Sequence, residues 1–300
     1  MEYRTLGKTG ERVSAIGIGG AHVGRASTAE EGIRIVRTAI DNGITFMDNC
    51  WDYAGGEAEI RMGKALRDGY RQRVFLMTKI DAHYAPVASQ QIDQCLSRLQ
   101  TDVIDLMQIH EVIRPDDPER AFAPGGTMEA LLAARKAGKI RYIGFTGHKD
   151  PDIHLKMLNM GFSWDTVQMP LNCLDASHKS FQAKVLPVLV ERGIGVLGMK
   201  PLAAGAAVRD GVATAEECLR YALSLPTSVV ITGCDSLAIV EQAIRVWQNF
   251  TPMTPDEMAA LRARAAARNQ DGVLEGYKTT HRFDGTINNP HWLTTASVTV

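Results

Sequence analysis

The chain has 300 residues, of which 45% are hydrophobic and 22% charged, and its formal net charge is −1. This composition is ordinary for a globular chain with a sizeable core. The basic residues are dispersed, which argues against a nucleic-acid or anionic-membrane surface. Charges stand at the N-terminus where a signal peptide needs an apolar stretch, and no run approaches the roughly 18 apolar residues of a membrane span. We expect a cytoplasmic protein.

The cysteines are odd in number and widely spaced, without a CxxC pair. Two interpretations are open: reduced thiols in a cytosolic protein, or a metal or disulfide framework. We favour the first and expect no metal site, because the scattered histidines lack metal-ligand spacing. The cysteines are Cys50, Cys95, Cys173, Cys218 and Cys234.

Short β-rich runs alternate with segments of helical periodicity along most of the chain. The pattern predicts strands at 13–18, 44–47, 73–78, 103–109, 140–145, 166–168, 194–198 and 228–231. It predicts helices at 28–42, 57–68, 89–100, 127–137, 151–159, 179–192, 214–224 and 236–248. Gly43, Gly138 and Gly193 follow three of these helices, where a left-handed cap is expected.

Eight strands alternating with eight helices indicate an α/β fold with a parallel sheet, which closes most simply into a (β/α)8 TIM barrel. A doubly wound open sheet is the alternative. Residues 5–13 contain a GKTGERV turn that suits a hairpin at the bottom of the barrel. A further helix is expected to begin near Pro255, followed by a tail lying on the surface or over a site. With no internal boundary, residues 1–300 are predicted to form one domain.

Three of the first four predicted strands end in a reactive side chain. GITFMD ends at Asp48, VFLMTK at Lys79 and VIDLMQIH at His110, and Tyr53 follows Asp48 by five positions. Neighbouring strands lie about 4.8 Å apart and their carboxyl ends meet at one face of a barrel. We therefore expect these four side chains to converge.

The expected cluster combines a phenol, an ammonium, a carboxylate and an imidazole. A free phenol has a pKa of about 10, and an adjacent ammonium lowers that value. A carboxylate holds the ammonium in place, and an imidazole can orient a carbonyl. Each residue alone has a structural interpretation, as an ion pair or as packing. Together they suit a reaction in which a carbonyl oxygen gains or loses a proton.

At these residues the chain resembles the aldo-keto reductase family. The stretch FMDNCWDYAGG is similar to the family's Asp-containing motif with Tyr five positions on, and Lys79 and His110 fall where its Lys and His lie. The resemblance runs from the YRTLGKTGERVSAIGIGG opening to about Val246. It implies a (β/α)8 barrel and carbonyl reduction by NADPH. It also implies that Tyr53 is the general acid, that Lys79 and Asp48 tune it, and that His110 orients the substrate.

The part of the chain where the family binds its cofactor is similar but altered. Thr146 keeps a hydroxyl where the family has the Ser of a Ser-Asn pair, Gly147 replaces the amide side chain, and His148 either fills the gap or leaves it open. Gln168 matches a contact to the nicotinamide carboxamide. Met199 replaces the aromatic residue that stacks on the nicotinamide. The loop crossing the pyrophosphate is expected to include Lys200, Pro201, Leu202 and Gly205.

VITGCDSLAIVEQA resembles the family segment that holds the adenosine phosphate, where backbone N–H groups opening a helix suit an anion. Ile239 and Ala243 stand where the family often has polar or basic residues. The resemblance implies NADP(H) in preference to NAD(H). The residues expected to bind this end of the cofactor are Gly233, Cys234, Asp235, Ser236 and Gln242.

We predict an NAD(P)H-dependent oxidoreductase that reduces an aldehyde or ketone, sugar-like or aromatic, to an alcohol. Its partner is a small-molecule carbonyl or alcohol, not nucleic acid or a membrane, and the sequence does not indicate an oligomeric state. Two alternatives remain: a Schiff-base aldolase using Lys79, and a non-catalytic nucleotide-sensing subunit. The loops near 114–126 and 283–292 are expected at the mouth. The residues expected to contact substrate are His22, Trp51, His83, Tyr84 and Glu111.

Overall fold

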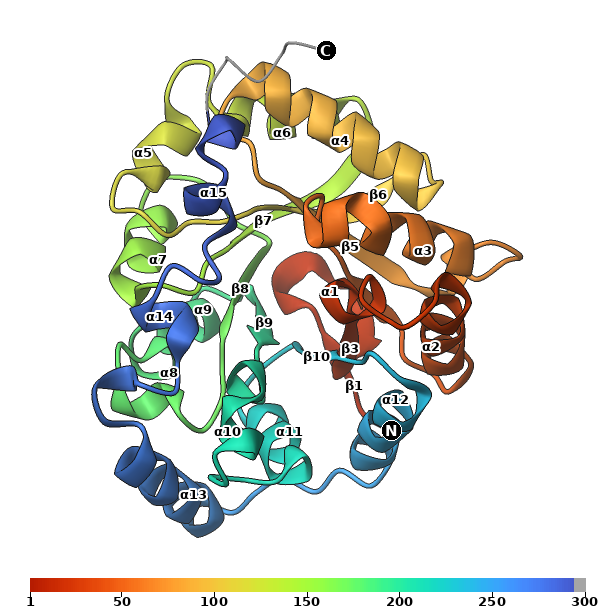
Figure 1. Cartoon of the computed structure of the whole chain (residues 1–300). Coiled ribbons are helices and arrows are strands. Elements are labelled where there is room, and N and C mark those ends of the chain that lie inside the picture. Colours follow the sequence, from red (N-terminus) through yellow and green to blue (C-terminus); the bar gives the residue numbers. More distant parts are fainter. Residues whose placement is uncertain (294–300) are drawn as a thin grey trace.

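A closed barrel of eight parallel strands forms the centre of the computed structural model, in which residues 1–293 are described (Figure 1). The strand order around the barrel is β10-β3-β4-β5-β6-β7-β8-β9. The predicted (β/α)8 fold is confirmed. The strands are β3 (Ile16–Gly19), β4 (Phe46–Asp48), β5 (Phe75–Ile80), β6 (Ile104–Ile109), β7 (Ile140–Thr146), β8 (Thr166–Pro170), β9 (Gly195–Met199) and β10 (Val229–Gly233).

An antiparallel hairpin precedes the barrel, as predicted. It consists of β1 (Tyr3–Thr5), η1 (Gly7–Thr9) and β2 (Arg12–Ser14). The backbone N–H of Lys8 donates to Gly193 O at 2.8 Å, just before β9, so the hairpin closes the amino-terminal end of the barrel. The predicted strand at 13–18 is wrong as one element. Its first part pairs with β1 and its second part, β3, pairs with β10 and β4.

Most predicted helices are present, with ends within four residues of those expected. They are α2 (Ala29–Asp41), α3 (Glu57–Ala65), α4 (Ala85–Leu99), α6 (Thr127–Lys136), α7 (Pro151–Leu158), α11 (Ala215–Ser224) and α12 (Leu237–Gln248). The predicted helix at 179–192 is instead two short helices, α8 (Phe181–Lys184) and α9 (Leu186–Glu191). Pro187 opens α9 and lacks the N–H that a continuous helix would need there. Gly43, Gly138 and Gly193 have positive φ, as expected for helix caps.

Short elements occupy the loops between the strands and the main helices. They are α1 (Gly20–Val23), η2 (Tyr53–Gly56), η3 (Arg71–Arg73), α5 (Asp117–Phe122), η4 (Asp175–Ser177), η5 (Ala203–Gly205) and α10 (Ala206–Arg209). The region 114–126, expected as a loop, therefore contains a helix. No helix within residues 1–293 has the length and apolar character needed to cross a membrane.

Apolar side chains fill the lower part of the barrel. Phe46, Phe75, Leu106 and Leu197 point into it and pack with Leu6 of the hairpin. A larger apolar cluster lies between the strands and the surrounding helices. Because the interior is closed with apolar groups, the buried polar side chains collect at the carboxyl ends of the strands.

The C-terminal segment, residues 269–293, runs back over the barrel after α13 (Pro255–Arg268), the helix predicted to begin at Pro255 (Figure 1). It contains η6 (Gln270–Gly272), α14 (Gly276–Thr279), α15 (Gly285–Asn288) and η7 (Pro290–Leu293). The buried Lys278 pairs with Asp175 at 2.7 Å and Glu275 at 2.8 Å. The N–H of Thr286 donates to Glu111 at 3.2 Å. The segment thus lies over the predicted site rather than elsewhere on the surface.

Candidate active site

Asp48, Tyr53, Lys79 and His110 meet at the carboxyl end of the barrel, and we call them the proton-transfer cluster. Asp48 ends β4, Lys79 is the penultimate residue of β5 and His110 follows β6. The Lys79 Nζ lies 2.5 Å from Asp48 Oδ1, 2.6 Å from the carbonyl oxygen of Asn49 and 3.4 Å from the Tyr53 hydroxyl. Parallel pairing of β4 with β5 and of β5 with β6 brings these residues together, as predicted.

Tyr53 enters the cluster from η2, directly after the loop that follows β4. Its ring lies 4.8 Å from the Lys79 ammonium and 6.1 Å from the His110 ring, nearly perpendicular to it. Burial, followed by the charge of Asp48, raises the pKa of Tyr53 well above its ordinary value. The expected lowering by Lys79 is therefore not the net effect. Asp48 pairs with that ammonium and reduces its influence on the phenol.

The imidazole of His110 contacts Asp81, an acid that the sequence pattern did not single out. Its Nδ1 lies 2.6 Å from Asp81 Oδ1 and 3.3 Å from Cys50 Sγ, whereas its Nε2 lies 3.9 Å from Glu111 Oε2. Burial lowers the pKa of His110. Asp81 stands two positions after Lys79, so the two-residue period of a strand could have placed both on one face.

The residues expected at the nicotinamide lie beside this cluster. Gln168, in β8, donates from Nε2 to Asp48 Oδ2 at 3.3 Å. Its other side-chain atom, Oε1, is buried without a hydrogen-bond partner in residues 1–293. Thr146 and Met199 end β7 and β9 and approach each other, with Oγ1 3.9 Å from Sδ. Buried acceptors are normally satisfied, so Gln168 Oε1 fits a ligand amide donor.

Gly147 and His148 behave differently from the family pair that they replace. A Cβ at position 147 would lie 2.2 Å from the carbonyl oxygen of Val112, so no amide side chain fits there. His148 is buried, with Nε2 3.0 Å from Asp284 and Nδ1 3.6 Å from Glu111. Burial lowers its pKa to about 3. Its ring is thus engaged by the C-terminal segment and Glu111.

The loop after β9 carries the residues expected at the pyrophosphate. Lys200 lies 5.5 Å from the ring centre of Tyr277 and 5.9 Å from that of Phe283, both in the C-terminal segment. Burial lowers the pKa of Lys200 to about 8, with Glu111 opposing this shift. Pro201, Leu202 and Gly205 follow in the turn that leads through η5 into α10, and Pro201 is buried.

The residues expected at the adenosine phosphate surround the turn between β10 and α12. Gly233 ends β10, and its backbone lies against the ring of His22, where a Cβ would be 2.1 Å from Nδ1. Cys234 is buried, Asp235 is exposed and Ser236 is the N-cap of α12. Gln242 lies further along α12, in a groove of about 330 Å³ that Arg220 and Arg245 also line. Ile239 is 39% exposed on the first turns of this helix.

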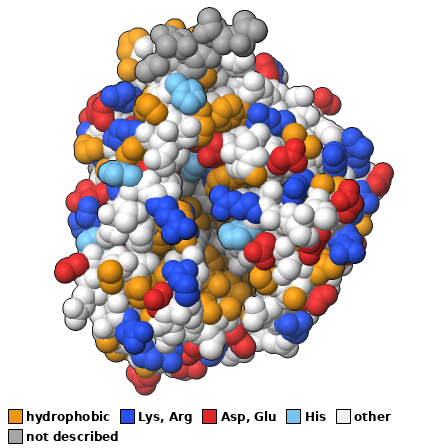
Figure 2. All heavy atoms as spheres, in the orientation of Figure 1, with side chains coloured by type: hydrophobic (Ala, Val, Ile, Leu, Met, Phe, Trp, Pro, Cys, Tyr) orange, Lys and Arg blue, Asp and Glu red, His pale blue; other side chains and the backbone are white. Residues whose placement is uncertain are grey.

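Glu111 and Trp51 lie at the mouth of the candidate active site, at the carboxyl end of the barrel. Glu111 is fully buried; its Oε1 accepts the N–H of Thr286, and its Oε2 has no hydrogen-bond partner in the described residues. Burial raises the pKa of Glu111 to about 7. The Trp51 ring packs edge-on against Trp292 at 5.4 Å. In the view of Figure 2 the surface is hollowed near the centre of the barrel, with Lys, Arg and His side chains around the hollow.

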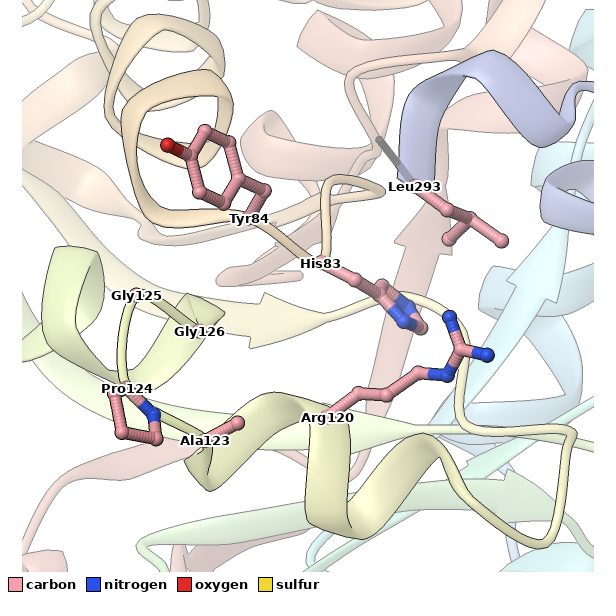
Figure 3. Close-up of a pocket in the computed structure, with 8 residues that line it drawn as sticks. All are labelled: His83, Tyr84, Arg120, Ala123, Pro124, Gly125, Gly126 and Leu293. Carbon is pink, nitrogen blue, oxygen red and sulfur yellow. The ribbon is translucent and has the colours of Figure 1, made fainter. Parts of the chain in front are cut away.

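A pocket of about 230 Å³ contains the other two residues expected to contact substrate (Figure 3). The His83 ring is buried and its Nδ1 lies 3.5 Å from Asp117, and burial lowers its pKa to about 4. In Figure 3 the Arg120 guanidinium lies beside the His83 ring, whereas the Tyr84 ring is directed away from His83. The pocket opens between the loops after β5 and β6. Its lining is His83, Tyr84, Arg120, Ala123, Pro124, Gly125, Gly126 and Leu293.

All five cysteines are free and buried. Those nearest the site are Cys50, described above, and Cys234, whose pKa burial raises to about 12. A thiol with so high a pKa is not a nucleophile near neutral pH.

Comparisons with known proteins indicate one family for this chain. The model of the Aldo/keto reductase family matches residues 15–210. L-galactose dehydrogenase of Arabidopsis thaliana is 30% identical over 223 residues, covering 70% of this chain and 68% of that protein. L-glyceraldehyde 3-phosphate reductase of Escherichia coli O157:H7 is 29% identical, covering 68% of this chain and 62% of that protein.

Solved structures show the same fold. The holo form of aldo-keto reductase AKR11C1 from Bacillus halodurans superposes with a TM-score of 0.74 and 25% identity, covering 91% of this chain and 99% of that chain. An aldo-keto reductase from Klebsiella pneumoniae in complex with NADPH gives a TM-score of 0.72 at 22% identity, covering 90% and 98%.

Proposed function

The chain belongs to the aldo/keto reductase family, and we propose that it reduces an aldehyde or ketone to an alcohol with NADP(H). Tyr53 is the general acid that protonates the alkoxide as it forms. The observation that carries this proposal is the contact of the Tyr53 hydroxyl with Lys79, itself paired with Asp48, at 3.4 and 2.5 Å.

The electrostatics of Tyr53 favour the reducing direction. Because burial and Asp48 raise the pKa of the phenol, Tyr53 stays protonated at neutral pH and has a proton to give. As negative charge develops on the substrate oxygen, the nearby Lys79 ammonium stabilises it. His110 supports the same oxygen from the other side of the cluster, since its Nε2 lies on the side of Glu111 and the mouth.

The residues at β7, β8 and β9 fit a nicotinamide. Gln168 Oε1 would accept a hydrogen bond from the carboxamide, and Met199 would give the ring an apolar surface. The reduced nicotinamide, when bound, supplies the hydride. Ser236 and the amides that open α12 suit the adenosine phosphate. The NADPH in the structural neighbour from Klebsiella pneumoniae supports NADP(H), although Ile239 offers no charge to a 2′-phosphate.

A small hydroxylated carbonyl compound is the substrate class that this mouth suits best. Glu111 Oε2 is a buried oxygen without a hydrogen-bond partner in residues 1–293, with His148 Nδ1 at 3.6 Å and His110 Nε2 at 3.9 Å, and a substrate hydroxyl beside the carbonyl would satisfy it. The printed names of two relatives, L-galactose dehydrogenase and L-glyceraldehyde 3-phosphate reductase, also refer to sugar-type compounds.

The two alternatives make different predictions. A Schiff-base aldolase needs a free Lys79 amine, but here Nζ contacts Asp48, the Asn49 carbonyl and Tyr53. Borohydride would trap substrate on Lys79 only in that case. A nucleotide-sensing subunit would bind cofactor without turnover.

The test is fluorescence titration with NADPH and NADH, followed by a panel of hydroxyaldehydes and aromatic aldehydes with the tighter cofactor. We expect oxidation of NADPH with at least one hydroxyaldehyde. Cofactor binding without turnover of any carbonyl compound would reject a reductase.

A further inference from the structure

Asp81 is a buried acid next to the cluster that the proposed reaction has not used. It follows β5 and is fully buried. The side chain of Gln91 accepts the backbone N–H groups of Asp81 and Ala82 at 2.9 and 3.0 Å. The position of the Asp81 backbone is therefore set by α4 and not by solvent.

The side chain of Asp81 makes two polar contacts within the site. Its Oδ1 lies 2.6 Å from His110 Nδ1, and its Oδ2 accepts the thiol of Cys50 at 3.6 Å. The thiol itself lies 3.3 Å from the same imidazole nitrogen. Nδ1 is thus turned into the protein toward Asp81, and Nε2 is left for the mouth.

The charges facing Asp81 do not favour its ionised form. Lys79 is the nearest cation that influences it, but this ammonium is already paired with Asp48. The other titratable groups that interact with it are the acids Cys50, Asp52, Tyr53, Glu59, Cys95 and Glu111 and the imidazole of His110. Burial raises the pKa of Asp81 well above its ordinary value and lowers that of His110, so burial favours the neutral form of both groups.

We propose that Asp81 is a positioning residue that, as a carboxylic acid, donates its proton in a hydrogen bond to His110 Nδ1 and so keeps the single imidazole proton on Nε2. A protonated carboxyl is a donor, and the hydrogen bond at one ring nitrogen decides which nitrogen carries the proton. The assignment rests on the proposed function for its purpose. The Nε2–H is the group that would donate to the substrate carbonyl oxygen.

The opposite proton arrangement would not serve this reaction. An ionised Asp81 would accept a proton held on Nδ1, and a neutral ring would then present the lone pair of Nε2 to the carbonyl oxygen. Two acceptors facing each other repel. Loss of one donor to a developing oxyanion typically costs about 10²–10³-fold in kcat.

The tautomer can be read directly from 15N-histidine-labelled protein. Long-range 1H–15N NMR correlations distinguish a protonated from a bare ring nitrogen, and the His110→Gln variant assigns the His110 signals. We expect Nε2 protonated and Nδ1 bare in the unsubstituted protein. The same is expected in Asp81→Asn, whose amide N–H can donate to Nδ1 while its oxygen accepts from Cys50. Zinc analysis comes first, because a metal held by Cys50, Asp81 and His110 would also leave Nε2 protonated.

Activity measurements separate positioning from folding. Asp81→Asn should keep most of kcat, whereas Asp81→Leu should mix the tautomers and lower kcat by about 10²-fold. Asp165→Asn is the control, because among residues 1–293 this carboxyl accepts only the Ile143 N–H, at 2.9 Å, at the other end of the barrel. Asp165→Asn should change neither the tautomer of His110 nor kcat.

Three results would overturn the assignment: a proton on Nδ1 in the unsubstituted protein, an unchanged tautomer and kcat in Asp81→Leu, or stoichiometric zinc that is lost in Cys50→Ser. The tautomer is measured without substrate. A protein with Nε2 protonated that reduces no carbonyl compound would reject the proposed function and retain the assignment of Asp81.

Discussion

The ammonium of Lys79 and the carboxylate of Asp48 form a buried ion pair, 2.5 Å apart, at the ends of two neighbouring strands. The pair is almost completely removed from solvent, and the Gln168 amide is a further donor to the carboxylate. A charge in such a place depends on its partner, because desolvation of a single ion is costly. The stability of the barrel and the acidity of Tyr53 are thus linked through one contact.

The first prediction concerns this ion pair. Lys79→Met should lower the free energy of unfolding by about 3–5 kcal/mol, because it leaves the Asp48 charge buried and unpaired. Adding Asp48→Asn should recover much of that loss without restoring turnover. Urea unfolding of the two single variants and the double variant measures the coupling. Equal stabilities of Lys79→Met and the double variant would contradict a buried ionic pair.

The second prediction concerns the general acid. Tyr53→Phe removes the proton donor but keeps the ring, so kcat should fall by about 10²–10⁴-fold while the affinity for NADPH stays the same. Steady-state kinetics and fluorescence titration measure the two quantities. Tyr70→Phe is a matched control, because the Tyr70 hydroxyl donates to Asp41 at 3.0 Å before β5 begins, away from the carboxyl ends of the strands. A Tyr53→Phe enzyme with most of its kcat would remove this residue from the mechanism.

The third prediction concerns Glu111 and pH. Its pKa rises from an ordinary 4.5 to about 7 in the folded protein, so the folded state holds this proton more tightly than the unfolded state. Stability should therefore fall as the pH rises from about 4.5 to about 7, by up to about 3 kcal/mol from this group. Glu111→Gln keeps the acceptor for Thr286 and should remove this dependence.

Chemical unfolding of both proteins at several pH values tests this expectation. The variant should gain stability relative to the unsubstituted protein above pH 7 and match it most closely near pH 4.5. Parallel curves across this range would show that Glu111 titrates at its ordinary value.

The fourth prediction concerns the choice of cofactor. Ile239 is 39% exposed near the start of α12 and cannot pair with a 2′-phosphate. Ile239→Arg should tighten NADPH by about tenfold, as expected for a charge-assisted hydrogen bond, and NADH much less. Gln248→Arg adds the same charge at the far end of this helix and should affect both cofactors equally. Equal tightening of both by Ile239→Arg, or a several-hundredfold NADPH preference in the unsubstituted protein, would place the phosphate elsewhere.

Much of the site was predictable because strand ends are visible in the sequence. Asp48, Lys79 and His110 each follow an apolar run, and parallel pairing of consecutive strands then places them side by side. The two-residue period of a strand would also have placed Asp81 on the same face as Lys79. The barrel itself follows from the eight repeats, and the glycine caps follow from helix ends.

Other features depend on contacts that no local pattern reveals. The apolar run at 13–18 divides because its two parts pair with different partners. Gly147 is required by the close approach of Val112, 35 residues earlier. The direction of the Tyr53 pKa shift depends on burial and on the pairing of Lys79 with Asp48. Segment 269–293 lacks periodicity, so its place over the mouth was not predictable in detail.

The C-terminal segment has a practical meaning for redesign. Its anchors on the barrel include Asp175, which pairs with Lys278, and Glu111 and His148, which contact Thr286 and Asp284. None of these three anchors belongs to the proton-transfer cluster. A chimera that exchanges the segment together with these anchors would therefore change the entrance to the active site. The proton-transfer cluster would keep its residues, so substrate range could be changed separately from proton transfer.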